Sequence, residues 1–233
     1  MTMLTDGFEL KNDDLGDELG HGSYKGAFIY KADENFVITK SHLPFGYSNE
    51  SDEMFEEERV ALHRLHNLGI GVSRILATGT VLGDRGQYPA NLMKRYAASN
   101  RSCSAQKIAS VLNERSVASL VRLHERLMDL DMSIWDLQFL VATDGEVVVN
   151  DPGRLHFNVI KQQHYTIKEN WYNIATMISA AEYSIYRRAN GMTVDGLYGD
   201  AYGYRDSSRS WFKTSGRYDD LRSKYSVLEW LDY

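Results

Sequence analysis

Short hydrophobic runs separated by turn residues dominate the N-terminal part of the chain. Residues 27–30 and 35–40 are β-prone runs on either side of Ala32-Asp33-Glu34, and this pattern predicts a hairpin. Two further strand-like runs, residues 75–82 and 91–96, are separated by the turn sequence Gly83-Asp84-Arg85-Gly86. We therefore expect a mainly β structure for this part of the chain.

One strong helical pattern interrupts these strands. Ser51 precedes two acidic residues and is suited to cap a helix N-terminus, where negative charge is also stabilising. Phe55, Leu62 and Leu65 then fall near one helical face, and Gly69 marks the end of the pattern. The sequence predicts a helix capped by Ser51 and stopped at Gly69.

The C-terminal part of the chain has mainly helical patterns around one hairpin. Residues 104–130 and 169–190 predict helices. Residues 137–141 and 146–149 predict strands joined at Asp144-Gly145, a dipeptide typical of tight hairpins. One helical stripe within residues 116–129 is formed by Val117, Leu120, Val121, Leu127 and Met128.

The chain changes character after Gly191. Residues 196–218 are rich in Gly, Tyr, Ser and Asp, so we expect a mobile loop there. Residues 219–233 carry several hydrophobic side chains and predict a short terminal helix.

Composition and charge narrow the class of protein. The chain has 233 residues, 43% of them hydrophobic and 25% charged, which suits one large domain or two small lobes. The net charge is −6 and the pI is about 5.7. This acidic balance lacks the excess of positive charge that binds nucleic acid or an anionic membrane, so we expect neither as a partner.

The single cysteine, Cys103, excludes an intrachain disulfide and fits a reducing cytoplasm, where we expect the protein to act. No flanking motif would activate this thiol, so we expect it to be inert. The N-terminal residues lack the apolar core of a Sec signal, and no apolar run approaches the roughly 20 residues of a membrane helix.

The first candidate for chemistry is the glycine-containing stretch that begins at Leu19. Gly20, Gly22 and Ser23 precede the first predicted hairpin, and glycines there let backbone N–H groups approach phosphate oxygens. The second strand of that hairpin ends in Lys40, and a lysine on a buried strand needs an anion. Glu58 lies on the following helix and is a candidate ion-pair partner of Lys40.

In this order, the elements over residues 16–180 resemble the protein-kinase-like superfamily, and most closely its compact members among bacteriophage proteins and secreted bacterial effectors. The resemblance implies that Gly20, Gly22 and Ser23 cradle ATP phosphates and that Lys40 and Glu58 form the nucleotide-orienting ion pair. It also implies that Met93 lies near the adenine.

Asp151-Pro152-Gly153 matches the family's Asp-Phe-Gly motif, with proline in place of phenylalanine. The resemblance implies that Asp151 binds Mg²⁺ through oxygen ligation. The residue follows three valines and Asn150, so it is expected at a strand end, where a carboxylate can be aimed.

The catalytic loop fits the family pattern in three alternative ways. Counting back from the metal carboxylate without gaps places Ser133 at the base position and Gln138 at the metal-binding Asn position. A second alignment, with two extra residues, makes Asp131 the base and Asp136 a metal ligand. A third makes residues 135–137 the catalytic turn and needs a deletion. The first predicts an inactive enzyme, and the sequence leaves all three open.

The resemblance implies an α+β, two-lobed kinase-like fold. Residues 1–97 would form a β-rich first lobe with one helix, and residues 98–233 a reduced, mainly helical second lobe. The leading function is ATP- and Mg²⁺-dependent phosphorylation of protein hydroxyls, Ser or Thr rather than Tyr. One alternative is a pseudokinase that binds nucleotide or a protein partner. The other is a small-molecule phosphotransferase, for which the segment after Asp151 leaves little room.

Three histidines and one tryptophan are expected to have structural rather than catalytic or metal-binding roles. His63 and His66 lie three residues apart on the first helix, but no further ligand follows at metal-binding spacing, so a solvated helix face is expected. His124 falls on the apolar stripe and is expected in the core, as is Trp171.

Overall fold

The chain forms two compact units. The structure, a computed structural model, describes residues 4–46, 49–162, 165–195 and 197–232. The first unit comprises Met1–Arg64 and Ser73–Arg95, and the second comprises Leu65–Val72 and Tyr96–Tyr233. The segment Leu65–Val72 therefore belongs with the second unit, although it precedes two strands of the first.

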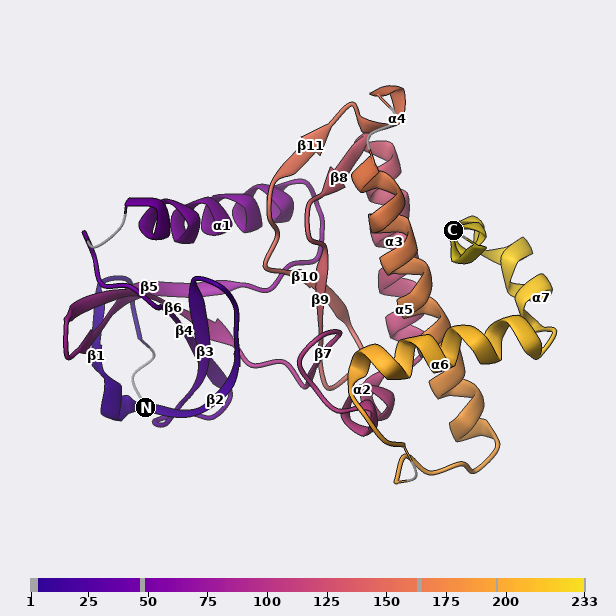
Figure 1. Cartoon of the computed structure of the whole chain (residues 1–233), viewed down its shortest axis with the longest axis horizontal. Coiled ribbons are helices and arrows are strands. Elements are labelled where there is room, and N and C mark those ends of the chain that lie inside the picture. The colour runs from indigo at the N-terminus through magenta and orange to yellow at the C-terminus, as the bar shows by residue number, and fades with distance from the viewer. Residues whose placement is uncertain (1–3, 47–48, 163–164, 196, 233) are drawn as a thin grey trace. The chain divides into compact units, whose positions relative to one another are not determined.

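The first unit is built on a six-stranded sheet with the order β1-β5-β6-β4-β3-β2 (Figure 1). Its strands are β1 (Phe8–Lys11), β2 (Leu15–His21), β3 (Lys25–Tyr30), β4 (Phe36–Ser41), β5 (Ile75–Gly83) and β6 (Gly86–Lys94). A short 3-10 turn, η1 (Asn12–Asp14), joins β1 to β2. β1 runs parallel to β5, and the other neighbours in the sheet are antiparallel.

The hairpin predicted in this unit is confirmed, and the two further strand-like runs lie in β5 and β6, which also pair with each other. β3 pairs with β4 from Lys25 opposite Ser41 to Ile29 opposite Val37. β5 and β6 pair down to Gly83 opposite Gly86, and Gly86 has a φ of +127° that suits glycine. One face of the sheet carries a hydrophobic core formed by Phe8, Leu10, Leu15, Ile38, Ala77, Val81, Ala90 and Leu92.

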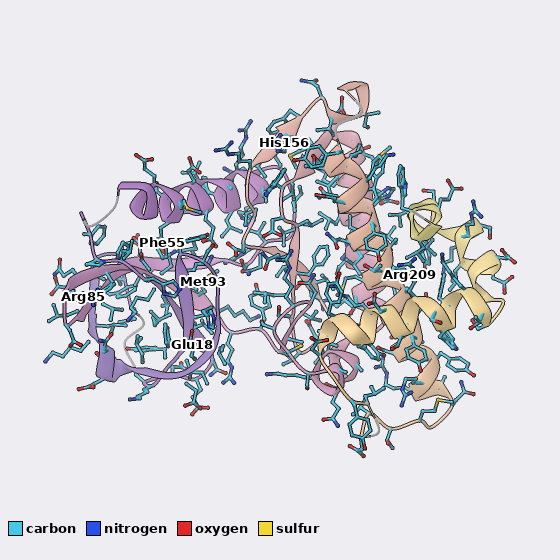
Figure 2. All side chains as sticks on the ribbon, in the orientation of Figure 1. Glu18, Phe55, Arg85, Met93, His156 and Arg209 are labelled. Carbon is cyan, nitrogen blue, oxygen red and sulfur yellow. The ribbon has the colours of Figure 1, made fainter. Side chains whose placement is uncertain are left out.

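The helix expected after the first hairpin is α1 (Asn49–Asn67). It begins two residues before the predicted cap, so Ser51 lies inside the helix and that boundary was wrong. The end is as predicted: Gly69 has a φ of +77°, and its N–H donates to the carbonyl of His66 at 2.9 Å. Phe55 and Leu62 are buried, as the hydrophobic spacing indicated. Phe55 is labelled in Figure 2.

The second unit combines helices with two small sheets. Its helices are α2 (Ala105–Val111), α3 (Glu114–Asp129), α4 (Val159–Gln162), α5 (Tyr165–Ala189), α6 (Ala201–Thr214), α7 (Arg217–Lys224) and the 3-10 helix η2 (Ser226–Asp232). Its strands are β7 (Ala98–Ser99), β8 (Met132–Ile134), β9 (Gln138–Val141), β10 (Val147–Asn150) and β11 (Leu155–Phe157). The sheets have the orders β10-β9-β7 and β11-β8.

α5 is the central helix of this unit and packs against α3, α6 and η2 (Figure 1). Trp171 is buried near its start, with its ring centroid 4.7 Å from that of Trp230 in η2, so the core position expected for Trp171 is confirmed. His124 of α3 packs edge-on against Trp171 and is half-buried. Among the helices that the structure describes, none is long and apolar enough to cross a membrane.

The single helix predicted for residues 104–130 is two helices. Leu112 has extended backbone angles and ends α2, and Asn113 then caps α3 by accepting a hydrogen bond from the backbone N–H of Arg115 at 2.8 Å. Asparagine caps helices well because its side chain competes with the backbone for such donors, so the break has a local cause.

The mobile loop predicted for residues 196–218 was wrong over most of its length, because α6 occupies Ala201–Thr214. Asp200 caps this helix by accepting from the backbone N–H of Gly203 at 2.8 Å. Tyr204, Ser208 and Phe212 recur every four residues and are buried on one face. The predicted terminal helix is replaced by α7 and the 3-10 helix η2.

Candidate functional site

The glycine-rich stretch is the connection between β2 and β3 in the first unit. Gly20 still pairs with Ala27 in the ladder, whereas Gly22 donates its N–H to the carbonyl of Lys25 at 2.8 Å and closes a tight turn through Ser23. A Cβ on Gly22 would meet only one atom within 4 Å, at 3.9 Å. The turn is therefore open, as a backbone that approaches a phosphate must be.

Gly26 is a third glycine of this stretch that sequence reasoning passed over. A Cβ at this position would lie 2.8 Å from the ring of Phe28, so a larger residue would displace that ring. The signal was visible in the sequence as a glycine four residues after Gly22, at the start of a strand.

The expected ion pair between Lys40 and Glu58 is not formed; the structure pairs Glu58 with Lys25 instead. Lys40 donates to Asn12 at 3.0 Å, and its ammonium lies over the rings of Phe28 and Tyr88. Burial lowers the pKa of Lys40, an effect that nearby carboxylates oppose. The prediction of the pair was wrong, for a reason set by strand geometry.

Successive side chains of a strand point to opposite faces of the sheet. Lys40 lies on the face of Ile38, which carries the hydrophobic core. Ser41 lies on the other face, and Lys25 is directly opposite it in the ladder, so these two side chains share that face. The sequence order of motifs could not distinguish a lysine on one face from a lysine on the other.

Met93, expected near the adenine, is buried in β6 (Figure 2). It pairs with Val37, and its sulfur accepts a hydrogen bond from Thr39 Oγ1 at 3.8 Å. Val37, Thr39 and Ser41 alternate along β4 on the same side, so Met93 shares its face of the sheet with the pair of Lys25 and Glu58.

The second unit gathers the polar residues of the catalytic-loop region. β8 ends at Ile134, and the chain then turns through Asp136 into β9. β9 and β10 form the predicted hairpin, with Gln138 directly opposite Asn150 at its open end. Asp151 follows at once. The hairpin therefore brings Asp136, Gln138, Asn150 and Asp151 to one end of the β9–β10 ladder.

Backbone hydrogen bonds hold the two turns of this site together. Trp135 donates its N–H to the carbonyl of Arg154 at 2.8 Å, and Gly153 donates its N–H to the carbonyl of Trp135 at 3.0 Å. A Cβ on Gly153 would lie 2.9 Å from that same Trp135 oxygen, so glycine is required for the contact. The glycine of Asp-Pro-Gly thus fixes the segment of Asp151 against that of Asp136.

The carboxylate of Asp136 has two side-chain partners. Gln138 donates its amide N–H to Asp136 Oδ2 at 2.8 Å, which leaves the amide oxygen of Gln138 as an acceptor for other groups. Arg101, from the loop after β7, forms an ion pair with Asp136 Oδ1. Both members of the ion pair are about half exposed, so solvent can reach the carboxylate.

Asp131 lies at the opposite end of β8 from Asp136. Its carboxylate accepts the backbone N–H of Ile160 at 2.7 Å, and its carbonyl accepts that of Val159 at 3.3 Å. Asp131 thus caps the start of α4. The arrangement separates Asp131 from the residues that the second alignment would have it serve.

Ser133, the base position of the gap-free alignment, is fully buried in the middle of β8. Its hydroxyl shares a hydrogen bond with Thr166 of α5. Of the three alignments, the third, with Trp135-Asp136-Leu137 as the catalytic turn, agrees best with the positions of these residues.

The donor set at the end of the β9–β10 ladder suits a hard cation. Two carboxylates and two amide oxygens are oxygen donors of the kind that Mg²⁺ takes, and Mg²⁺ keeps several waters of its own, so few protein ligands suffice. Among the described residues, no group of three or more His, Cys, Asp or Glu side chains is arranged to hold a metal. The oxygen donors present therefore suit Mg²⁺ bound through few protein ligands.

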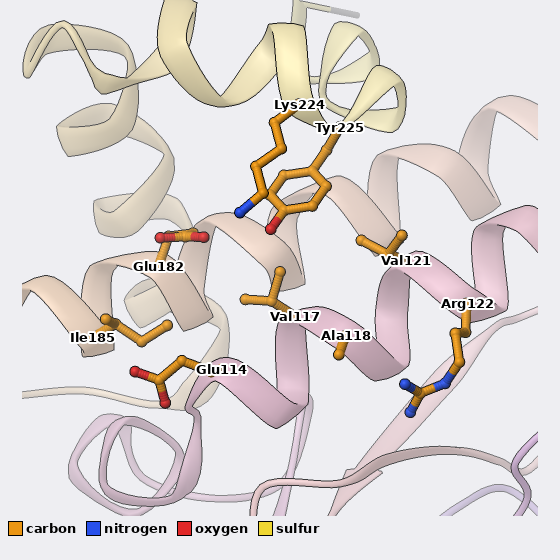
Figure 3. A pocket seen from close by; sticks show the side chains of 9 residues that line it. All are labelled: Glu114, Val117, Ala118, Val121, Arg122, Glu182, Ile185, Lys224 and Tyr225. Carbon is orange, nitrogen blue, oxygen red and sulfur yellow. The ribbon is translucent and has the colours of Figure 1, made fainter.

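Two other features lie outside this site. Burial raises the pKa of the Cys103 thiol, which agrees with the inert thiol expected from the sequence. A cavity of about 460 Å³ lies among α3, α5 and the end of α7 (Figure 3). Its lining is part apolar, with Val117, Val121 and Tyr225, and part charged, with Glu114, Arg122, Glu182 and Lys224. None of its lining residues belongs to the candidate site.

The fold and these sites define the class of the protein. A sheet with a glycine turn and a following helix, then a mainly helical unit in which a hairpin presents Asp-Pro-Gly, make a protein-kinase-like domain. Residues 2–185 match the family model of the type III secretion system effector HopBF1 kinase domain, and the chain belongs to this family. The comparison with curated proteins gives no match.

The family membership confirms the expected resemblance to compact effector kinases and the mixed α+β fold. A kinase domain implies the use of ATP in general. Sequence reasoning missed Lys25, Arg101 and Asn150 as members of these sites. Lys25 and Arg101 carried no signal in a single sequence, whereas Asn150 was visible as the neighbour of Asp151 at the end of a strand.

Proposed function

We propose that the protein is a protein kinase that transfers the γ-phosphoryl group of ATP, with Mg²⁺, to Ser or Thr hydroxyls of a protein substrate. The observation that supports this most strongly is the meeting of Asp136, Gln138, Asn150 and Asp151 at one end of the β9–β10 ladder. Phosphoryl transfer needs this combination of groups, namely a carboxylate near the acceptor hydroxyl and oxygen ligands for a cation.

In this proposal, Asp136 is the residue that touches the acceptor. Its carboxylate would accept a hydrogen bond from the attacking hydroxyl and align the oxygen. It would take up the proton as that oxygen bonds to the γ-phosphorus and the bond from the γ-phosphorus to the bridging oxygen breaks, which releases ADP. Gln138 would keep the carboxylate in place through the 2.8 Å hydrogen bond to Oδ2. Arg101 holds the other oxygen.

Asp151, with the amide oxygens of Gln138 and Asn150, would hold Mg²⁺. When bound, the ion offsets negative charge on the phosphate oxygens. In the first unit, the open turn of Gly20, Gly22 and Ser23 would let phosphate oxygens approach its backbone, although the N–H of Gly22 already donates to the carbonyl of Lys25. The face that carries Met93 would receive the adenine.

The test is transfer of labelled γ-phosphate from Mg²⁺-ATP to proteins of a cell lysate. We expect Asp136→Asn and Asp151→Asn each to lower the transfer rate by roughly 100-fold or more, the usual effect of losing an acid–base or metal-binding group. Asp129→Asn, at an exposed carboxylate on the last residue of α3, is the matched control and should transfer at the wild-type rate. Phosphoamino-acid analysis of the products tests the preference for Ser and Thr.

Asp131→Asn separates the alignments of the catalytic loop. If Asp136 is the base, this change should leave the fold intact and the transfer rate close to that of the wild type, because an asparagine amide oxygen can still accept the N–H of Ile160 and asparagine tolerates the positive φ at this position. Transfer that survives Asp136→Asn and vanishes in Asp131→Asn would contradict the assignment and favour the second alignment.

The same assay covers the alternatives. Binding of ATP with no transfer to any protein, together with a stable partner in a pull-down, would indicate a pseudokinase. ATP turnover stimulated by a small alcohol and not by protein would indicate a small-molecule phosphotransferase. We expect the protein to act in a reducing cytoplasm, since its one thiol requires no disulfide.

A further inference from the structure

Lys25, Tyr24 and Glu58 form a polar cluster on one face of the sheet in the first unit. Lys25 forms an ion pair with Glu58 Oε2, and Tyr24 donates its hydroxyl to the same oxygen at 3.0 Å. The side chains of Lys25 and Glu58 are only 12% and 4% exposed. The carboxylate comes from α1, and its two donors come from the start of β3 and the residue before it.

A buried ion pair of this kind contributes little net free energy to folding, because both charges must be removed from water. The cost of removing two charges from water is close to the energy their attraction returns, so apolar residues of similar size stabilise a fold equally well. A buried pair beside an open glycine turn is therefore a candidate for function rather than for folding.

The position of the pair supports a role with phosphate. Lys25 closes the glycine turn by accepting the N–H of Gly22 on its carbonyl, so its ammonium is tied to the segment that would cradle phosphates. It lies on the face of the sheet that also carries Thr39 and Met93. Glu58 holds the ammonium in place through the ion pair, so the positive charge stays at the end of the glycine turn.

We propose that Lys25, and not Lys40, is the lysine that holds the phosphates of the nucleotide, with Glu58 as the residue that positions it. This assignment rests on the proposed use of ATP and deepens it. The lysine would then come from β3, directly after the glycine turn, rather than from β4, where the order of motifs places it.

Lys40 makes its contacts on the other face of the sheet and does not contact Glu58. Its ammonium contacts Asn12 and the rings of Phe28 and Tyr88 on the opposite face of the sheet. To reach Glu58, its side chain would have to cross from one face of β4 to the other, and the alternation of a strand prevents this.

The test compares the dissociation constants of Mg²⁺-ATP and of adenosine by calorimetry. For Lys25→Met we expect Mg²⁺-ATP to bind about 10- to 100-fold more weakly, as for loss of a charge-assisted contact, while adenosine affinity changes less than about threefold. The double variant Lys25→Met/Glu58→Gln removes the carboxylate that the single change leaves unpaired, and should show the same split. Lys31→Met, on an exposed lysine just after β3, is the matched control.

The variant Lys40→Met decides between the two lysines. If Lys40→Met loses more Mg²⁺-ATP affinity than Lys25→Met does, the assignment of Lys25 is wrong. An equal fall in ATP and adenosine affinity in the folded double variant would also overturn it, because it would show that the pair only supports the structure. If the wild type binds Mg²⁺-ATP and transfers no phosphate, the kinase proposal fails, whereas the binding comparison still decides the role of Lys25. If the wild type does not bind Mg²⁺-ATP, both proposals fail.

Discussion

Three aspartates around the second unit's site adopt backbone conformations that most residues avoid. Asp131, Asp136 and Asp151 have φ values of +47°, +55° and +50°. The left-handed region is tolerated by aspartate better than by most residues, yet it still costs free energy. At Asp131 the conformation accompanies a helix cap. At Asp136 and Asp151 it lies in the two turns that Trp135 and Gly153 tie together, where strain is commonly found in functional loops.

Arg101 allows a test of how Asp136 is held. We expect Arg101→Ala to lower the phosphoryl-transfer rate several-fold, because the carboxylate loses the partner of its Oδ1. Thermal stability should change little, since an ion pair this exposed contributes at most about 1 kcal/mol. Steady-state kinetics and a melting curve on the same preparation measure both effects.

Arg115→Ala is the control for Arg101, because Arg115 pairs with Asp144 and Glu146 at similar exposure on the hairpin turn. It should leave the rate unchanged. An equal rate for wild type and Arg101→Ala would show that Gln138 alone orients Asp136.

At the scale of elements, the sequence predicted most of what local spacing determines. The β3–β4, β5–β6 and β9–β10 hairpins follow from their turn residues. In α3, the helical period correctly placed Val117, Leu120 and Leu127 in the core, whereas Met128 is exposed and its place on the buried stripe was wrong. α6 was missed because its sequence is rich in residues that favour turns. Its helical state depends on a face buried against α5, and the local composition of α6 does not reveal that packing.

Phe212 tests whether α6 is packed or mobile. It is fully buried, so Phe212→Ala should lower the free energy of unfolding by about 3–5 kcal/mol. Tyr198, just before α6, is 89% exposed, and Tyr198→Ala should leave that free energy within about 0.5 kcal/mol. Urea denaturation measures both. Equal stability for the two variants would mean that residues 201–214 behave as the loop that their composition suggests.

At the scale of the whole molecule, the folded second unit continues beyond the residues that match the family model. The match covers residues 2–185, whereas α6, α7 and η2 follow that region and complete the second unit around α5. Leu228 and Leu231 of η2 are fully buried. The segment after the matched region is therefore part of the folded unit.

His124 gives the stability a pH dependence. Burial lowers the pKa of His124 below the ordinary value of a histidine, so the folded protein binds this proton less readily than the unfolded chain does. Its contribution to stability is complete above the unfolded pKa and is lost as the pH falls through that value toward the lowered folded pKa. We expect the free energy of unfolding to decrease from pH 7 towards pH 5, in part through this residue.

Substituting His124 isolates its share. In His124→Gln, the fall in unfolding free energy between pH 7 and pH 5 should be smaller than in the wild type, as measured by urea denaturation at each pH. Identical slopes for wild type and His124→Gln would show that the imidazole titrates alike in both states.

The sequence alone determined the class of fold, the hairpins, the metal carboxylate candidate Asp151 and its neighbour Gln138, because each depends on nearby residues and on the order of elements. The tertiary structure decided which residues act together. The partner of Glu58 depends on which face of the sheet a side chain occupies, and ladder register places Lys25 there. The choice among Asp131, Ser133 and Asp136 depends on where β8 ends and on its contacts with α4 and α5. Such contacts join residues far apart in the chain, so local spacing carries no record of them.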